Sequence, residues 1–204
     1  AAAGTPSPWR VLRSRDVWLV SIATILFAGL QASLLGYLVL FLQERQGLSV
    51  VAAGRVLAGA QMAGLAGRIV FGVLSDRLFG GRRRVVLFLA GATSACLAAA
   101  MARVGPGTPL WVVAPLSLLF GFVGIGWNGV QLTLLAELAG KALAGTAVGL
   151  GLAVSAVGVI AVPPAFGRLV EATGDYRWAW LSLTGIMLAA LLLLVPVREP
   201  ARRR

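Results

Sequence analysis

The chain has 204 residues, of which 59% are hydrophobic and 12% are charged, and its formal net charge is +11. Because soluble domains carry about 25% charged residues, this composition excludes an ordinary soluble globule and indicates a protein that crosses a membrane several times. The positive charge does not indicate a nucleic-acid partner, since no basic face with interleaved aromatic residues remains once the apolar segments are set aside.

Taken in chain order, six apolar segments reach the length of about 20 residues that a membrane-spanning helix needs. Residues 1–16 precede them and have the composition of a linker, which we place on the cytoplasmic side. Residues 17–197 then form a six-helix transmembrane bundle, and residues 198–204 form a basic cytoplasmic tail. The expected spans are Val17–Leu42, Val50–Leu74, Val85–Ala102, Leu110–Leu138, Leu143–Val170 and Trp178–Val195.

The basic residues are distributed unevenly between the two ends of these spans. One end carries Arg10, Arg13, Arg15, Arg77, Arg82, Arg83, Arg84, Lys141, Arg198, Arg202, Arg203 and Arg204. The other end carries only Arg45, Arg103 and Arg177, with Arg168 close by. Because basic loops are retained in the cytoplasm, we expect both termini to be cytoplasmic and the protein to lie in the plasma or inner membrane.

An internal repeat relates the second span to the fifth. The stretch AGRVLAGAQMAGLAG from Ala53 aligns with AGTAVGLGLAVSAVG from Ala144, which places Gly67 on Gly158. Further matches are Phe71 with Phe166, Asp76 with Glu171 and Arg82 with Arg177. Two units of three helices have opposite orientations in a membrane, so we predict inverted repeats, an architecture of transporters. The small residues serve close packing alone, or they also let the helices slide during a transport cycle.

The loop between the second and third spans, GRIVFGVLSDRLFGGRRR from Gly67 to Arg84, carries the densest group of charges. Asp76 is either a solvated residue at a helix end or part of a gate. As a gate residue it would accept hydrogen bonds from a helix N-terminus, while Arg77 pairs with a carboxylate such as Glu137. Arg68 either snorkels to the interface, joins Glu137 or Asp76 in a charge network, or contacts substrate.

This loop resembles the loop signature of the major facilitator superfamily, in which a glycine, a small polar residue and Asp-Arg precede glycines and a basic cluster. The matching residues are Gly72, Ser75, Asp76, Arg77, Gly80, Gly81, Arg82, Arg83 and Arg84. One extra residue separates Arg77 from the basic pair. Three further stretches are similar to the start of the seventh helix, the tenth helix, and the junction of the eleventh and twelfth helices of that family: Arg13–Val20, Gly126–Leu138 and Pro163–Trp180.

The resemblance implies an all-α membrane fold of six transmembrane helices, built as two inverted three-helix repeats, that is the C-terminal half of a major facilitator transporter. It further implies secondary active transport of a small molecule by alternating access, with the loop as a gate. The N-terminal six helices would then be a missing partner, and the absence of an initiating Met suggests a fragment or a processed chain.

Uncharged polar residues within the spans are the candidates for a substrate cavity. Trp127, Asn128 and Gln131 share one face of the fourth span, and Gln31 and Tyr37 lie in the first. By resemblance, these two spans line the cavity. Because amides in lipid need partners, these residues either form interhelical hydrogen bonds or line a water-filled cavity. No Asp, Glu or Lys lies near the centre of a span, so a proton-coupling carboxylate is either in the missing half or not used.

Pro163 and Pro164 interrupt the fifth span near its outer end. Proline removes a backbone donor and clashes with the preceding turn. We therefore predict a helix break or kink there, either as a simple bend or as a flexible gating point.

The chain contains no histidine and one cysteine, Cys96. This excludes His metal sites, Ser-His or Cys-His catalysis and an intrachain disulfide, and we expect no enzyme activity, metal or cofactor. A membrane receptor or a scaffold subunit stays an alternative to a transporter. An intramembrane enzyme is less favoured, because it would need a Ser-His pair, paired aspartates or a metal set.

Overall fold

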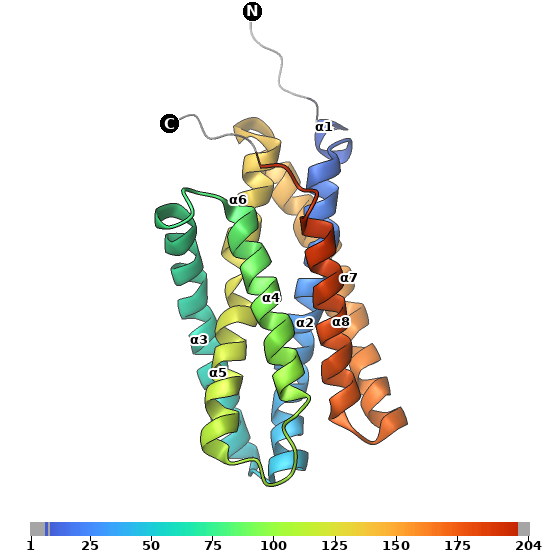
Figure 1. Ribbon diagram of the computed structural model, residues 1–204. Helices are drawn as coiled ribbons and strands as arrows, with labels where there is room; N and C mark the ends of the chain where they lie inside the picture. The colour runs from blue at the N-terminus through green and yellow to red at the C-terminus, as the bar shows by residue number, and fades with distance from the viewer. Residues whose placement is uncertain (1–6, 8, 200–204) are drawn as a thin grey trace, which may run out of the picture.

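The computed structural model describes residue 7 and residues 9–199, and over these residues the regular structure is helical (Figure 1). The helices are α1 (Trp9–Leu12), α2 (Arg15–Gln46), α3 (Val50–Arg77), α4 (Arg83–Met101), α5 (Leu110–Gly126), α6 (Asn128–Ala139), the 3-10 turn η1 (Lys141–Leu143), α7 (Ala144–Thr173) and α8 (Tyr176–Leu194). Within these described residues, six helical segments are long and apolar enough to cross a membrane, which confirms the six predicted spans. The predicted linker and tail fall partly on residues 1–6, 8 and 200–204, which lie outside the described residues.

Side-chain caps and glycines set the ends of the long helices. The hydroxyl oxygens of Ser14 and Ser49 accept from backbone amides in the first turns of α2 and α3, and the Asp175 carboxylate does the same for α8. Gly47 and Gly174 end α2 and α7 at φ of 64° and 65°, a left-handed conformation that glycine adopts without steric cost.

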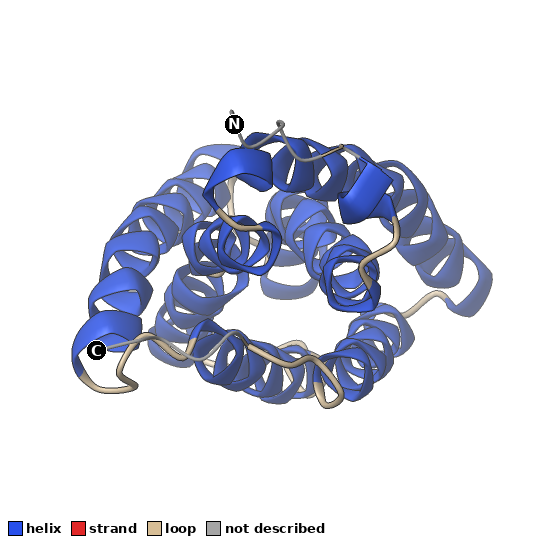
Figure 2. Cartoon of the chain, turned by 90° about the horizontal axis from the view of Figure 1, so that it is seen from above, coloured by secondary structure: helices blue, strands red, loops and turns tan. Residues whose placement is uncertain are grey.

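The connections alternate between the two ends of the bundle. The α3–α4 loop, the α6–η1 turn, α1 and the segment after α8 lie at one end (Figure 1), which we call the arginine-rich end. The α2–α3, α4–α5 and α7–α8 connections lie at the other, which we call the opposite end. Figure 2 shows the bundle from above the arginine-rich end.

One repeat consists of α2, α3 and α4, and the other consists of α5 with α6, α7 and α8. The two repeats pack against each other at two tight helix crossings. A Cβ on Gly158 of α7 would overlap the carbonyl oxygen of Ile25 on α2. Likewise, a Cβ on Gly67 of α3 would overlap the carbonyl oxygen of Phe122 on α5. Gly67 and Gly158 are the residues that the repeat aligns, and each lets its second helix contact the first helix of the other repeat. The inverted repeats are therefore confirmed.

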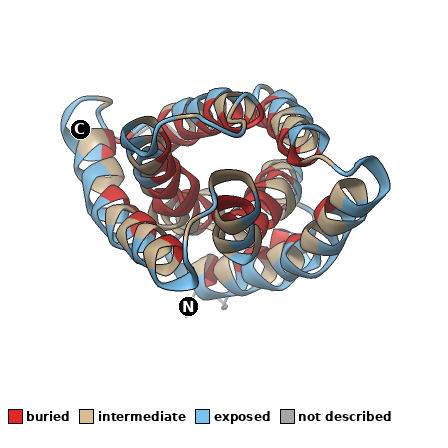
Figure 3. Cartoon of the chain, turned by 90° about the horizontal axis from the view of Figure 1, so that it is seen from below, coloured by how far each residue is buried: buried red, intermediate tan, exposed pale blue. Residues whose placement is uncertain are grey.

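The two second helices, α3 and α7, are the least covered parts of the bundle. In their most apolar windows only 17% of the residues are buried, against 50% for α2 and α4. Figure 3 shows the buried residues gathered on the inward faces of the helices. The outward faces of α3 and α7 are consequently free to meet lipid or another protein.

The fourth and fifth spans differ in detail from the prediction. The fourth is two helices, α5 and α6, which meet at Trp127. In contrast, α7 runs through Pro163 and Pro164 without ending, so the two prolines do not break the helix. Membrane helices tolerate proline where the freed backbone groups are satisfied locally. A bend at the two prolines stays a prediction.

Candidate functional site

The α3–α4 loop turns tightly because two consecutive glycines adopt positive φ. Gly80 and Gly81 have φ of 58° and 81°, values that other residues rarely adopt. The Gly81 amide donates to the Ser75 carbonyl oxygen at 2.6 Å, which closes the end of α3. The turn brings the start of α4 back beside the last turn of α3.

Arg83, the first residue of α4, joins three helices at this turn. Its Nη2 lies 2.6 Å from Oδ1 of Asp76 on α3, and its Nε lies 3.6 Å from Oε1 of Glu137 on α6. Arg83 is only 7% exposed. A guanidinium at such a place needs charged partners, because burying an unpaired cation costs several kcal/mol. The cluster of Asp76, Arg83 and Glu137 thus ties both repeats together at the arginine-rich end.

Of the other residues of the predicted gating loop, Gly81 is buried and the rest lie at or near the surface around this cluster. Arg77 and Arg82 are exposed, and a Cβ on Gly72 would meet open space. The predicted pairing of Arg77 with Glu137 stays a prediction, and it is Arg83 that bridges Asp76 and Glu137. Arg68 is exposed on α3, and among the described residues it has no hydrogen bond or ion pair.

A second charged cluster lies at the opposite end, where α2 meets the α7–α8 turn. The Arg45 guanidinium pairs with Asp175 and donates to the Gly174 carbonyl oxygen at 3.3 Å. Beside it the Tyr176 hydroxyl donates to Oε2 of Glu44 at 3.0 Å. The ring of Tyr176 packs edge to face against Phe41 and at a tilt against Phe166, at one end of an aromatic cluster that extends into the bundle. Its members are Tyr37, Phe41, Phe120, Phe166 and Trp180.

At the break between α5 and α6, side chains replace the missing helical hydrogen bonds. The Trp127 indole Nε1 donates to the Gly124 carbonyl oxygen at 2.9 Å. The Asn128 Nδ2 donates to the Ile125 carbonyl oxygen at 2.9 Å and to Oε1 of Gln31 on α2 at 2.8 Å. Inside a membrane, such freed carbonyl groups must be satisfied within the protein, so both side chains have a structural task at this break.

The five residues predicted to line a cavity do not lie together but occupy three different locations in the bundle. Gln31, Trp127 and Asn128 come together at the α5–α6 break, and Trp127 is 2% exposed with its ring 5.2 Å from that of Phe27. Tyr37 lies against α7, with its ring 4.7 Å from Phe166. Gln131 is 1% exposed, and its Nε2 has no partner among the described residues. Whether these residues contact substrate stays a prediction.

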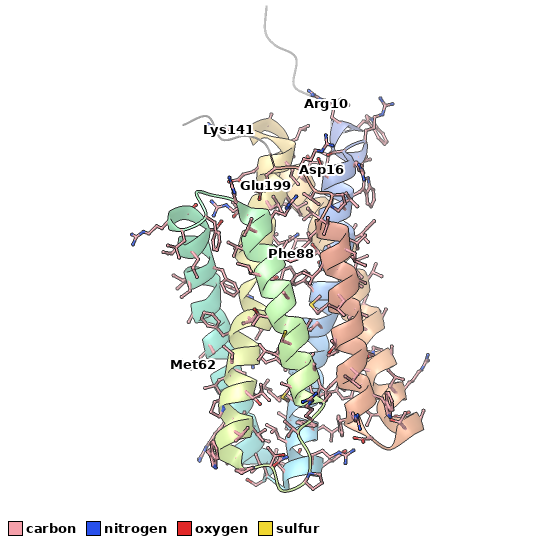
Figure 4. The ribbon with its side chains drawn as sticks, in the orientation of Figure 1. Arg10, Asp16, Met62, Phe88, Lys141 and Glu199 are labelled. Carbon is pink, nitrogen blue, oxygen red and sulfur yellow. The ribbon has the colours of Figure 1, made fainter. Side chains whose placement is uncertain are left out.

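The segment after α8 crosses the arginine-rich end and holds the start of α4. Glu199, labelled in Figure 4, accepts a hydrogen bond from the Arg84 backbone amide. The Arg84 guanidinium donates to the carbonyl oxygens of Val195 and Val197. On the other side of the segment, the Arg198 amide donates to Asp16 of α2 at 3.4 Å. Sequence reasoning missed these contacts, because an apolar span followed by basic residues gives no signal of them.

The profile of the Major Facilitator Superfamily matches residues 2–163 of the chain. The chain belongs to the major facilitator superfamily. It is thus a multi-pass membrane protein of a family of transporters rather than enzymes. It is 31% identical over 192 residues to an uncharacterized MFS-type transporter of Mycobacterium tuberculosis, with 94% of this chain and 42% of that protein covered.

A second relative and a solved structure also match this chain over about half of their own length. The probable sulfoacetate transporter SauU of Cupriavidus necator is 30% identical over 203 residues, with 96% of this chain and 46% of that protein covered. The crystal structure of the fucose:proton symporter FucP of E. coli has the same fold, with a TM-score of 0.76 and 21% identity over 94% of this chain and 45% of that one. The chain spans about half the length of the relatives it matches, as expected of one six-helix half of a major facilitator.

Proposed function

We propose that the chain is the C-terminal half of a major facilitator permease, which moves a small molecule across the membrane by alternating access together with a second six-helix half. The half-length matches to its relatives support this proposal. So do the uncovered faces of α3 and α7, which offer the second half a surface to pack on. The glycines and other small residues of these helices allow the close approach of backbones that such packing uses.

The gate of this permease is the cluster of Asp76, Arg83 and Glu137. The observation that supports it best is the burial of Arg83 between carboxylates from α3 and α6. In the closed state the ion pairs hold α3, α4 and α6 together. Opening separates these helices and exposes the charges to water, where ion pairs contribute little. The ion pairs therefore stabilise the closed state while water is excluded from them, and they contribute little once the gate has opened and water reaches them.

Replacing Asp76→Asn in the full-length protein tests this role. The variant keeps the shape of the side chain but loses the charge that pairs with Arg83, so we expect normal membrane insertion and slower transport, by about tenfold for the loss of about 1.4 kcal/mol. Glu171→Gln is the matched control, because Glu171 occupies the repeat-related position and is exposed. Unchanged flux in Asp76→Asn would show that the cluster is not a gate.

The substrate class is a small organic anion. This choice rests on the relative named for sulfoacetate, a molecule with a carboxylate and a sulfonate. Vesicles that carry the full-length protein should take up or release sulfoacetate in preference to neutral solutes, and measurements with and without a pH gradient would show whether protons drive the flux. Equal flux of neutral and anionic solutes would contradict this substrate class.

The arginine-rich end faces the cytoplasm of a cell that carries the protein in its plasma or inner membrane. Arginines that resist translocation support this orientation, since Arg77, Arg82, Arg83 and Arg84 all lie near that end. A reporter fused after residue 204 should be active in the cytoplasm. A reporter signal outside the cell would reverse the assignment.

A further inference from the structure

One face of α3 carries two polar side chains at membrane depth. At 1.5 Å per residue, Arg68 lies about 13 Å along the axis before the end of α3 at Arg77. Gln61 lies about 10 Å deeper still, near the middle of the helix. Both are exposed, and neither has a hydrogen bond or ion pair within the described part of the chain. The hydrocarbon layer is about 30 Å thick, so both backbones lie within it.

Helical geometry places Gln61 and Arg68 one above the other on a single face of α3, which differs from the face toward α5 and from the apolar flank. A spacing of seven residues is close to two full turns. Gly64 and Gly67 point at α5, where added Cβ atoms would meet Ile125 and Phe122. Met62 points away from the bundle (Figure 4). The opposite flank of α3 is apolar, and its shallow hollow of about 280 Å³ is lined mainly by apolar residues: Ile69, Val70, Val73, Leu74, Arg77 and Leu78.

Because Gln61 lies near the middle of α3, we infer that the face it shares with Arg68 does not contact lipid. Arg68 alone could snorkel, because its long side chain can reach the interface. The side chain of Gln61 is too short to leave the hydrocarbon layer from the middle of α3, and an unpartnered amide there costs several kcal/mol. The polar face therefore fits a water-filled space between the two halves of the transporter.

The repeat shows that the fold itself does not require polar residues here. The alignment that places Gly67 on Gly158 also places Gln61 on Leu152 and Arg68 on Val159. Leu152 and Val159 are 52% and 50% exposed on α7. Because α7 has the equivalent place in the fold and carries apolar side chains at these positions, Gln61 and Arg68 are not needed for folding. They therefore serve a role that is specific to α3.

We propose that Arg68 binds the anionic group of the transported molecule, a carboxylate or sulfonate, and that Gln61 holds a second polar group of it deeper in the membrane. A guanidinium presents a rigid fork of donors that matches two oxygens of such a group. The carboxylates nearest along α3 and α6, Asp76 and Glu137, both face Arg83 instead. This proposal rests on the proposed transport function.

Thiol labelling in the full-length protein tests the site without knowledge of the substrate. Leu65 lies one turn from both Gln61 and Arg68 and is 60% exposed. In a background whose own cysteines, Cys96 included, are replaced by serine, Leu65→Cys would be treated with methanethiosulfonates that carry either a sulfonate or a trimethylammonium group. We expect the anionic reagent to react about tenfold faster, because a fixed cation in a cleft concentrates anions.

Four further variants complete this experiment. Arg68→Gln should remove the preference for the anionic reagent, and Arg68→Lys should keep it. Arg55→Gln, an exposed arginine elsewhere on α3, should leave it unchanged. Val70→Cys, on the apolar flank, should react slowly with both reagents, since the reactive thiolate does not form in hydrocarbon. Arg68→Lys also separates loss of charge from loss of folding.

The proposal is overturned if Leu65→Cys reacts no faster than Val70→Cys, or if Arg68→Gln leaves the preference intact. A carboxylate of the other half that neutralises Arg68 would also abolish the preference in the parent protein and overturn it. Sulfoacetate should slow the labelling of Leu65→Cys. If it does not, while the preference persists, the substrate class of the proposed function is wrong and the anion site stands.

Discussion

The two ends of the bundle use the same helical junction with the charges exchanged. At the arginine-rich end, the cation is Arg83 of α4, the third helix of the first repeat. Its partners are Asp76 of α3 in the same repeat and Glu137 of α6 in the other repeat. At the opposite end, the turn before α8 supplies the anion, Asp175, and α2 supplies the cation, Arg45. Each end therefore has an ion pair where the start of the third helix of one repeat meets the first helix of the other, with the charges reversed.

The junctions also differ in their access to water. The cations differ most: the side chain of Arg83 is 8% exposed and that of Arg45 is 24% exposed, whereas the carboxylates are exposed at both ends, Asp76 by 56% and Asp175 by 45%. Water screens Arg45 more strongly than Arg83, so the two junctions should contribute unequal free energies. Two sets of variants and one change of ionic strength test this difference.

The largest losses of stability are expected at the two glycine crossings, where α3 meets α5 and α7 meets α2. Gly67→Ala and Gly158→Ala each place a methyl group on a carbonyl oxygen of the facing helix, so each should destabilise the bundle by about 3 kcal/mol. Thermal denaturation in detergent would measure this as a lowered apparent Tm. Gly149→Ala is the control, because its Cβ meets open space. A loss at only one crossing would contradict the equivalence of the repeats.

Removal of the cations should have an intermediate effect that separates the two junctions. Arg83→Met leaves Asp76 and Glu137 without their buried cation and should cost about 2 kcal/mol, a value lowered from that of a fully buried pair because Asp76 is half exposed. Arg45→Met should cost only about 0.5–1 kcal/mol. The same melting assay checks both variants. Equal losses would mean that burial does not distinguish the junctions.

Salt should produce the smallest effect and should act mainly at the opposite end. Raising the ionic strength from about 0.1 M to about 1 M shortens the screening length from about 10 Å to about 3 Å. The difference in apparent Tm between the parent protein and Arg45→Met should then shrink, while that for Arg83→Met should largely persist. The reverse order would show that Arg83 is the more hydrated of the two cations.

Apolar length and glycine placement were enough to predict the six spans and the repeat. The reason is physical: a bilayer dictates the length of its helices, and a crossing that brings backbones together tolerates only the smallest residues. Gly67 and Gly158 were therefore readable from the sequence as equivalent positions, and the structure places each of them against the first helix of the other repeat.

The geometry of the charged and polar residues could not be predicted in the same way. Arg77, Arg82, Arg83 and Arg84 are chemically alike, and the turn at Gly80 and Gly81 decides which of them faces Asp76. The break at Trp127 was also hidden, because the apolar run continues through it. It depends on Trp127 and Asn128 reaching back to carbonyl groups, a property of three-dimensional geometry that a hydropathy pattern does not contain.

The contact between Glu199 and the Arg84 amide has a consequence for the order in which the bundle is built. The two residues are 115 positions apart. A ribosome that adds about 5–20 residues per second needs roughly 6–23 s to make the intervening chain. During this interval α4 exists without the carboxylate at its first turn, and α2 without the Arg198 amide at Asp16. The contacts of residues 195–199 therefore form only after the six helical segments before them have been synthesised.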